Sequence, residues 1–102
     1  FHSPFMAPAA GGMQEALAKA TLNAPKIDVW SNVTAELHTL EQMQECLVTQ
    51  ITGSVRWAQS CGAMATVYDR CRWHELAPSG VLRGLMRRVN RDVKVLPHDE
   101  PK

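Results

Sequence analysis

Cysteine is scarce in this chain of 102 residues, and no C-x-x-C pair occurs. The three cysteines, Cys46, Cys61 and Cys71, are an odd number, which argues against both a disulfide framework and a zinc site. The chain also has no apolar run long enough for a membrane span and no basic leader before such a run, so we expect neither insertion nor secretion. Reduced thiols favour a cytoplasmic location, and a mitochondrial one stays open.

Net charge is also small, at +1, but the charges are unevenly distributed. Residues 1–53 hold two lysines against five acidic residues, whereas residues 54–94 hold eight basic residues against three acidic ones. A near-neutral chain with one basic strip is a poor candidate for nucleic-acid binding. The basic half can instead attract an acidic partner, and this attraction weakens as the salt concentration rises.

Apolar residues recur at helical spacing in four places. The sequence predicts helices over residues 6–20, about 40–51, about 55–66, and directly after the turn at 77–80. Thr39 and Gln42 fit the capping box of the second helix, and Ser54 fits the N-cap of the third.

Two short segments have the residue types of β-strands, namely residues 27–30 and residues 72–76. Strands that alternate with helices imply parallel pairing through crossovers. The expected fold class is therefore α/β, with about four helices and two short parallel strands. Residues 1–95 are expected to be the folded part, and residues 96–102, with two prolines and mixed charges, a flexible tail.

Residues 1–8 read Phe-His-Ser-Pro-Phe-Met-Ala-Pro, and a predicted helix follows. This run resembles the histidine motif of malonyl-CoA:acyl carrier protein transacylases and of the related acyltransferase domains of fatty-acid and polyketide synthases. A serine hydroxyl is a poor nucleophile at neutral pH, and in this family the histidine takes its proton. The resemblance implies that His2 is this catalytic base.

The family's serine lies on a Gly-x-Ser-x-Gly motif, which is absent from these residues. The resemblance therefore implies that residues 1–95 are the C-terminal portion of a larger α/β-hydrolase-like acyltransferase domain. The missing N-terminal part of that domain would then be a partner of this segment.

Further segments match the family in the same order along the chain. Residues 29–33 resemble a family strand that ends in Ser-Asn-Val or Asn-Asn-Val, and residues 47–57 resemble its Leu-Val-x-Gln-Leu-x-x-Pro-Val-x-Trp run. In that match, Gln50 takes the position whose main-chain carbonyl holds the catalytic imidazole in its working tautomer, a task that a carboxylate performs in many serine hydrolases.

The chain departs from the family at residues 75–82, which correspond to a Glu-x-Gly-Pro-Gly-x-Val-Leu turn. Ala77 and Ser79 replace the two glycines. A side chain at either position carries strain if the backbone there requires a positive φ, whereas Ser79 as an N-cap would allow an ordinary strand-to-helix connection.

Phe1 precedes the histidine, at a place where phenylalanine goes with malonyl selection in the synthase domains and a smaller residue with methylmalonyl. An aromatic ring narrows the space beside the acyl α-carbon, so a methyl branch would clash. The resemblance thus implies that Phe1 contacts the substrate.

Arg83, Arg87 and Arg88 lie at helical spacing in the last predicted helix. They form either a solvated face with cations near the favourable C-terminal end of the helix, or a surface that binds the acidic carrier protein, with nucleic acid and membrane less favoured.

The resemblance implies malonyl transfer from CoA to acyl carrier protein in fatty-acid or polyketide synthesis, through an acyl-enzyme. This chain would supply the histidine but not the serine, so the segment alone is expected to be inactive. Malonyl-CoA and acyl carrier protein are the expected partners, CoA and phosphopantetheine enter as substrates, and neither a metal nor another cofactor is implied. The alternative is a non-catalytic, truncated α/β module that binds acyl carrier protein or another protein.

Overall fold

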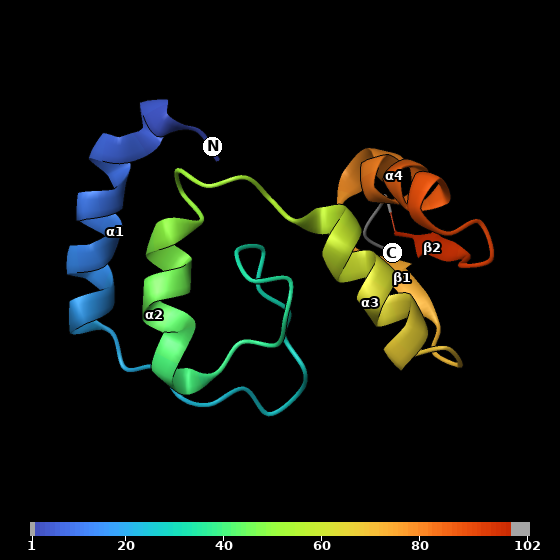
Figure 1. Cartoon of the computed structure of the whole chain (residues 1–102), viewed down its shortest axis with the longest axis horizontal. Helices are drawn as coiled ribbons and strands as arrows, with labels where there is room; N and C mark the ends of the chain where they lie inside the picture. Colours follow the sequence, from blue (N-terminus) through green and yellow to red (C-terminus); the bar gives the residue numbers. More distant parts are fainter. Residues whose placement is uncertain (1, 99–102) are drawn as a thin grey trace. The chain divides into compact units, whose positions relative to one another are not determined.

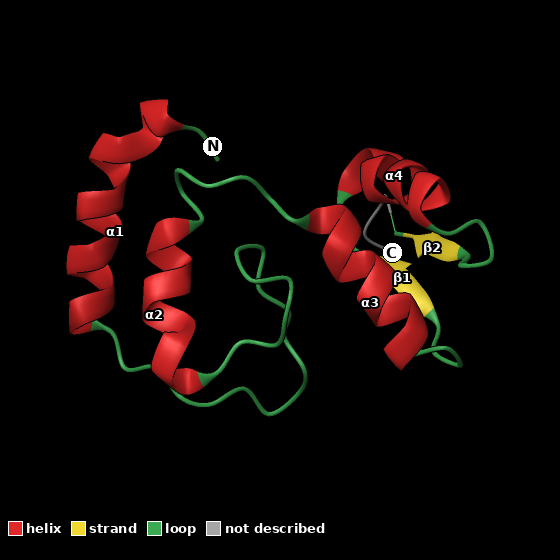
Figure 2. Ribbon diagram, in the orientation of Figure 1, coloured by secondary structure: helices red, strands yellow, loops and turns green. Residues whose placement is uncertain are grey.

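The computed structural model describes residues 2–98, and the chain divides into two compact units, Phe1–Ser60 and Cys61–Lys102 (Figures 1 and 2). The helices are α1 (Ala7–Lys19), α2 (Leu40–Thr49), α3 (Trp57–Val67) and α4 (Val81–Val89), and the strands are β1 (Trp73–Glu75) and β2 (Val95–Pro97). Among the described residues, the α/β class with four helices and two short parallel strands is confirmed.

In the first unit, α1 and α2 lie side by side (Figure 1). A short 3₁₀ turn over Pro4–Met6 leads into α1, and the Ser3 hydroxyl caps it by accepting the Phe5 N–H at 3.1 Å. The α2 N-cap is the predicted one, since the Gln42 N–H donates to Thr39 Oγ1 at 3.3 Å. Cys46 on α2 and Ile51 just beyond it are the buried apolar side chains of this unit.

The strand predicted over residues 27–30 is wrong. Trp30 pairs with Leu37 in an isolated antiparallel bridge, and the chain turns back at once because the Ser31 N–H donates to Glu36 O at 2.8 Å. The Ser31 hydroxyl holds this turn by accepting the N–H groups of the two residues Val33 and Thr34. Strand residue types therefore predict a strand only where a neighbouring strand exists to complete the ladder.

In the second unit, β1 and β2 pair in parallel, with Trp73 opposite Val95 and Glu75 opposite Pro97. Helix α4 forms the crossover between the two strands (Figure 2). The prediction of parallel strands joined by a helix is thus confirmed, but the strand that pairs with β1 is Val95–Pro97 rather than residues 27–30, and it includes two residues assigned to the flexible tail. Residues 99–102 of that tail lie outside the described residues.

Glu75 at the end of β1 is only 3% exposed, and it caps α4. Its Oε1 accepts the Leu82 N–H at 2.8 Å and its Oε2 accepts the Arg83 N–H at 3.0 Å. A buried carboxylate is satisfied in this way by two of the free N–H groups at the helix N-terminus, where the helix dipole also favours negative charge. The neighbouring His74 is exposed, as expected for adjacent residues in a strand.

The turn between Glu75 and α4 shows what the two departures from the family's glycines do. Ala77 has φ −87° and ψ 150°, a conformation that any residue adopts, whereas Ser79 has φ 79° and Gly80 has φ 66°. Ser79 is therefore not the N-cap that the sequence allowed; Gly80 takes that position, and because it has no side chain of its own, the cap comes from Glu75. Of the two replaced positions, only that of Ser79 has the left-handed backbone that glycine adopts without strain.

We expect Ser79→Gly to raise the free energy of unfolding by about 0.5–1 kcal/mol, because relief of left-handed strain exceeds the added entropy of the unfolded chain. Ala77→Gly is the matched control: its backbone is unstrained, so we expect a loss of about 0.5–1 kcal/mol. Urea denaturation of the three proteins measures both changes. A serine-to-glycine variant no more stable than the unmodified protein would contradict the strain.

Candidate functional site

His2 and Gln50 are brought together in the first unit. The Nδ1 atom of His2 lies 2.7 Å from the main-chain oxygen of Gln50, the contact that the family resemblance implies. A carbonyl oxygen only accepts hydrogen bonds, so Nδ1 carries the proton and donates it. The neutral imidazole then has its lone pair on Nε2, which is the tautomer that a base acting through Nε2 requires.

Helix α2 positions the acceptor, because Gln50 is its C-cap. The last carbonyls of a helix have no partner within the helix, and the negative end of the helix dipole lies there. The Gln50 N–H donates to Cys46 O at 3.0 Å, which continues the helical pattern and leaves its own carbonyl for the imidazole. This carbonyl is a good acceptor that also favours positive charge on the ring.

The backbone next to the histidine is held by the following carbonyl. Ser3 N donates to Ile51 O at 3.3 Å, and the Ile51 side chain is only 4% exposed. His2 itself has φ 61°, a left-handed conformation that costs a residue with a side chain about 1–3 kcal/mol. Consecutive carbonyls of residues 50 and 51 thus hold consecutive residues 2 and 3, and these contacts oppose the strain.

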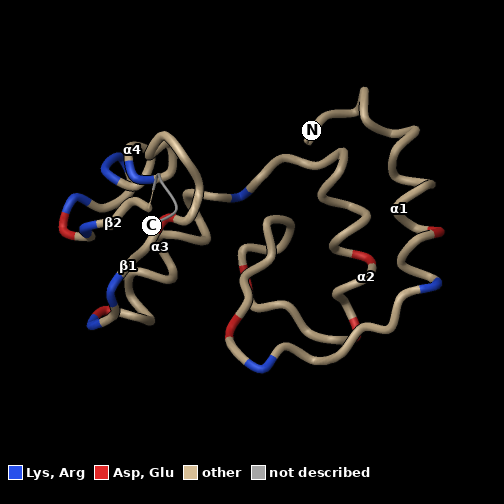
Figure 3. The backbone as a smooth tube through the Cα atoms, turned by 180° about the vertical axis from the view of Figure 1, so that it is seen from behind, with Lys and Arg blue, Asp and Glu red and all other residues tan. Residues whose placement is uncertain are grey.

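The three arginines predicted as binding residues lie on α4 in the second unit, and all three are exposed. Figure 3 shows basic residues gathered on α4 and on the chain that follows it. An open hollow of this surface is lined by Gly84 together with four basic residues, Arg87, Arg88, Arg91 and Lys94. Phe1, the remaining predicted site residue, lies outside the described residues.

Two contacts were not predicted. The Asn32 side-chain amide donates to Gln50 Oε1 at 3.4 Å, and His74 Nδ1 lies 2.9 Å from His98 Nε2. The histidine pair was not predicted because His98 directly follows β2, and the sequence assigned part of that strand to the flexible tail. Within residues 2–98, no group of three or more His, Cys, Asp or Glu side chains could hold a metal ion.

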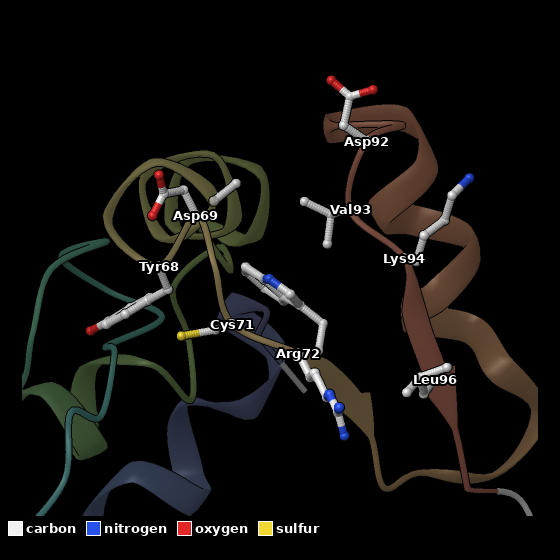
Figure 4. Close-up of a pocket in the computed structure, with 10 residues that line it drawn as sticks. Tyr68, Asp69, Cys71, Arg72, Asp92, Val93, Lys94 and Leu96 are labelled. Carbon is white, nitrogen blue, oxygen red and sulfur yellow. The ribbon is translucent and has the colours of Figure 1, made fainter.

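A cavity of about 340 Å³ in the second unit contains none of the predicted site residues. It lies between the chain after α3, which contributes Tyr68 and Cys71, and the chain leading into β2, which contributes Asp92 and Lys94 (Figure 4). Its lining carries both signs of charge, which the residue pattern gave no reason to expect. No helix within the described part of the chain has the length and hydropathy to cross a membrane.

No family model matches this chain. The polyketide biosynthesis malonyl CoA-acyl carrier protein transacylase of Bacillus subtilis (strain 168) is 34% identical over 97 residues, which are 95% of this chain and 33% of that protein. The crystal structure of malonyl-CoA:acyl carrier protein transacylase from Xanthomonas oryzae pv. oryzae is 33% identical and has a TM-score of 0.87, over 98% of this chain and 32% of that one. The predicted resemblance to malonyl-CoA:acyl carrier protein transacylases is thereby confirmed.

The chain spans about one third of the length of the transacylases that it matches. A further structure holds a malonyl-transacylase in complex with its type II PKS acyl-carrier protein; that transacylase is 25% identical, with a TM-score of 0.85 over 98% of this chain and 32% of that one. The fold class is confirmed by the same matches, since this α/β arrangement recurs in the solved transacylases.

Proposed function

We propose that the full-length protein transfers malonyl from CoA to the phosphopantetheine thiol of an acyl carrier protein, and that this segment supplies the general base. The observation that carries the proposal is the 2.7 Å contact between His2 Nδ1 and Gln50 O, which selects the tautomer that a base acting through Nε2 needs. The similarity of this chain to malonyl-CoA:acyl carrier protein transacylases supports malonyl-CoA and acyl carrier protein as the substrates.

In the first half-reaction, a serine supplied by residues outside this chain attacks the thioester carbonyl while His2 Nε2 takes the hydroxyl proton. The carbon–sulfur bond breaks, and the proton passes to the departing CoA thiolate. In the second half, the carrier's thiol gives its proton to Nε2, its sulfur attacks the acyl-enzyme, and the carbon–oxygen bond breaks. The proton returns to the serine oxygen, so the imidazole is neutral again after each half. CoA and phosphopantetheine take part only as substrates, and no other cofactor enters the proposed cycle.

The imidazole is positively charged between the two proton transfers of each half-reaction. The Gln50 carbonyl at the negative end of α2 stabilises that charge through the short Nδ1 hydrogen bond. In this proposal the main-chain carbonyl does the work of the carboxylate in many hydrolase triads. A main-chain carbonyl at the end of a helix is held in place by the helix itself, so α2 determines where this oxygen lies.

Selection of malonyl by Phe1 is a further part of the proposal, and it rests on the resemblance alone. So does the pathway, which is fatty-acid or polyketide synthesis. A cytoplasmic location is supported by the free thiols of Cys46, Cys61 and Cys71.

The basic face of α4 is proposed to bind the acidic carrier protein. Four basic side chains line one hollow there, and the relative solved with its acyl-carrier protein shows that a similar transacylase forms such a complex. Like charges gathered at a surface raise the rate of encounter with an acidic partner, and salt weakens the effect. Arg87 and Arg88 both line the hollow, and Arg83 lies about one turn before them on the same helix.

We expect the double variant Arg87→Glu, Arg88→Glu to raise the KM for carrier protein about tenfold or more at low salt, since rim charges govern association. The KM for malonyl-CoA should stay unchanged. The double variant Arg70→Glu, Arg72→Glu, which reverses two exposed charges outside α4, is the matched control. Steady-state transfer at two salt concentrations measures these effects, and an equal loss in the control would mean that net charge rather than this face is responsible.

Malonyl transfer from CoA to holo-carrier protein by the full-length protein tests the catalytic proposal itself. Formation of malonyl-carrier supports it. A folded protein that binds the carrier and forms none would instead support the non-catalytic module.

A further inference from the structure

Asn32 contacts the residue that holds the catalytic imidazole. Its side-chain Nδ2 donates to Gln50 Oε1 at 3.4 Å, and both side chains are half-buried. The Gln50 main-chain oxygen accepts the His2 Nδ1 proton at 2.7 Å. Asn32, Gln50 and His2 are thus linked in one series, although residues 2 and 32 are distant in the sequence.

The turn that carries Asn32 is itself firmly held. The Ser31 hydroxyl accepts the Val33 N–H at 3.1 Å, and the Ala35 N–H donates to Ser31 O at 3.1 Å. The main-chain oxygen of Asn32 accepts the Arg56 N–H at 2.9 Å, so the turn is tied to the chain beyond Gln50. Ser31 is only 1% exposed, which places the base of the turn in the interior. Asn32 therefore presents its amide from a fixed support.

Gln50 needs such a support because it ends a helix, where the backbone frays most easily. Its N–H is held by Cys46 O, and its own carbonyl faces the imidazole. A third attachment, through the side chain, restricts the rotation that would turn the carbonyl away. Restricting a group that orients the base is the role of supporting residues around a catalytic site.

We propose that Asn32 is a positioning residue for the base: by holding the Gln50 side chain, it keeps the Gln50 carbonyl directed at His2 Nδ1. This inference rests on the proposed function of His2. It assigns a role to the amide of the Ser-Asn-Val turn, which acts through Gln50 and does not touch the reacting atoms.

The test is a double-mutant cycle in the full-length protein with Asn32→Ala, Gln50→Ala and the double variant. A single neutral hydrogen bond corresponds to a change of about three- to tenfold, so we expect Asn32→Ala to lower kcat/KM for transfer by that factor without changing the KM for malonyl-CoA. Gln50→Ala should give a similar loss, because it removes the same side-chain contact, although the main-chain carbonyl is still present. The double variant should lose no more than either single variant.

Thr34→Ala is the matched control, since it removes the hydrogen bond from Glu36 N to Thr34 Oγ1 in the same turn without touching Gln50. It should leave transfer unchanged. Nitrogen-15 NMR of the His2 ring supplies a readout independent of turnover: the Nδ1-protonated tautomer should dominate in the unmodified protein and give way to a mixture in Asn32→Ala.

Losses that multiply in the double variant, or an Asn32→Ala protein with unchanged tautomer, would overturn the inference. Equal losses in Thr34→Ala would also overturn it, since the whole turn rather than the amide would then matter. An unmodified protein that transfers no malonyl would overturn the proposed function instead, and the tautomer measurement would still decide whether Asn32 orients His2.

Discussion

Replacing His2 with alanine in the full-length protein is expected to lower malonyl transfer by a factor of about 10³ or more, within the range typical of losing a positioned general base. The loss should fall on kcat/KM for both half-reactions, because in the proposed cycle the same imidazole takes the serine proton in one and the thiol proton in the other. Acyl-enzyme formation from labelled malonyl-CoA and transfer to holo-carrier protein measure the two halves separately.

Asparagine at the same position separates the two functions of the ring. In His2→Asn the side-chain amide can donate to the Gln50 carbonyl as Nδ1 does, but it has no basic nitrogen. We expect this variant to fold with unchanged stability and to be as inactive as His2→Ala. If either variant kept a tenth of the activity, His2 would not be the base.

Glu75→Ala is expected to lower the free energy of unfolding by about 2–4 kcal/mol, the largest stability effect that we expect from one substitution in this chain. The carboxylate is 3% exposed and accepts the N–H groups of Leu82 and Arg83. Alanine would remove the acceptor of both N–H groups in a partly buried place and remove a negative charge from the positive end of α4. Urea denaturation measures the change.

Glu75→Gln is the graded control, because the amide keeps the shape and one acceptor oxygen but not the charge. We expect a smaller loss, about 1–2 kcal/mol. If Glu75→Ala unfolded at the same urea concentration as the unmodified protein, the carboxylate would not be what holds the start of α4 to β1.

Local sequence signals were sufficient for the helices. Periodic apolar residues and the Thr39 cap placed α2 within two residues of its observed end, because a helix makes its hydrogen bonds within its own segment. The third helix began later than predicted, at Trp57, and Ser54 does not cap it. An N-cap residue type shows roughly where a helix begins but not at which residue. The chain before the helix can make other contacts, as the Arg56 N–H does with Asn32 O.

Strands were predicted less well, because a strand makes its hydrogen bonds with another segment rather than within its own. Residues 27–30 have strand composition but only a single bridge, whereas residues 95–97, which end in a proline, pair with β1. A strand is completed by another segment, and its residue types alone do not say which segment that is. The sequence predicted strain at Ala77 or Ser79 only if the backbone there has a positive φ. The folded chain decided that Ser79 is the one that does.

For the candidate site, too, the sequence predicted some features and only the folded chain decided others. His2 and Gln50 were predicted as site residues from their place in two motifs that resemble the family's, and such motifs can be read from the sequence alone. That His2 lies 2.7 Å from the carbonyl at the end of α2, that Asn32 holds the same residue from another turn, and that Glu75 caps α4 depended on the folded chain. These contacts join residues separated by many positions, and their geometry is set by how helices, turns and strands pack rather than by any local pattern. Residue identity thus determined which chemistry is present in this chain, and packing determined which groups meet to perform it.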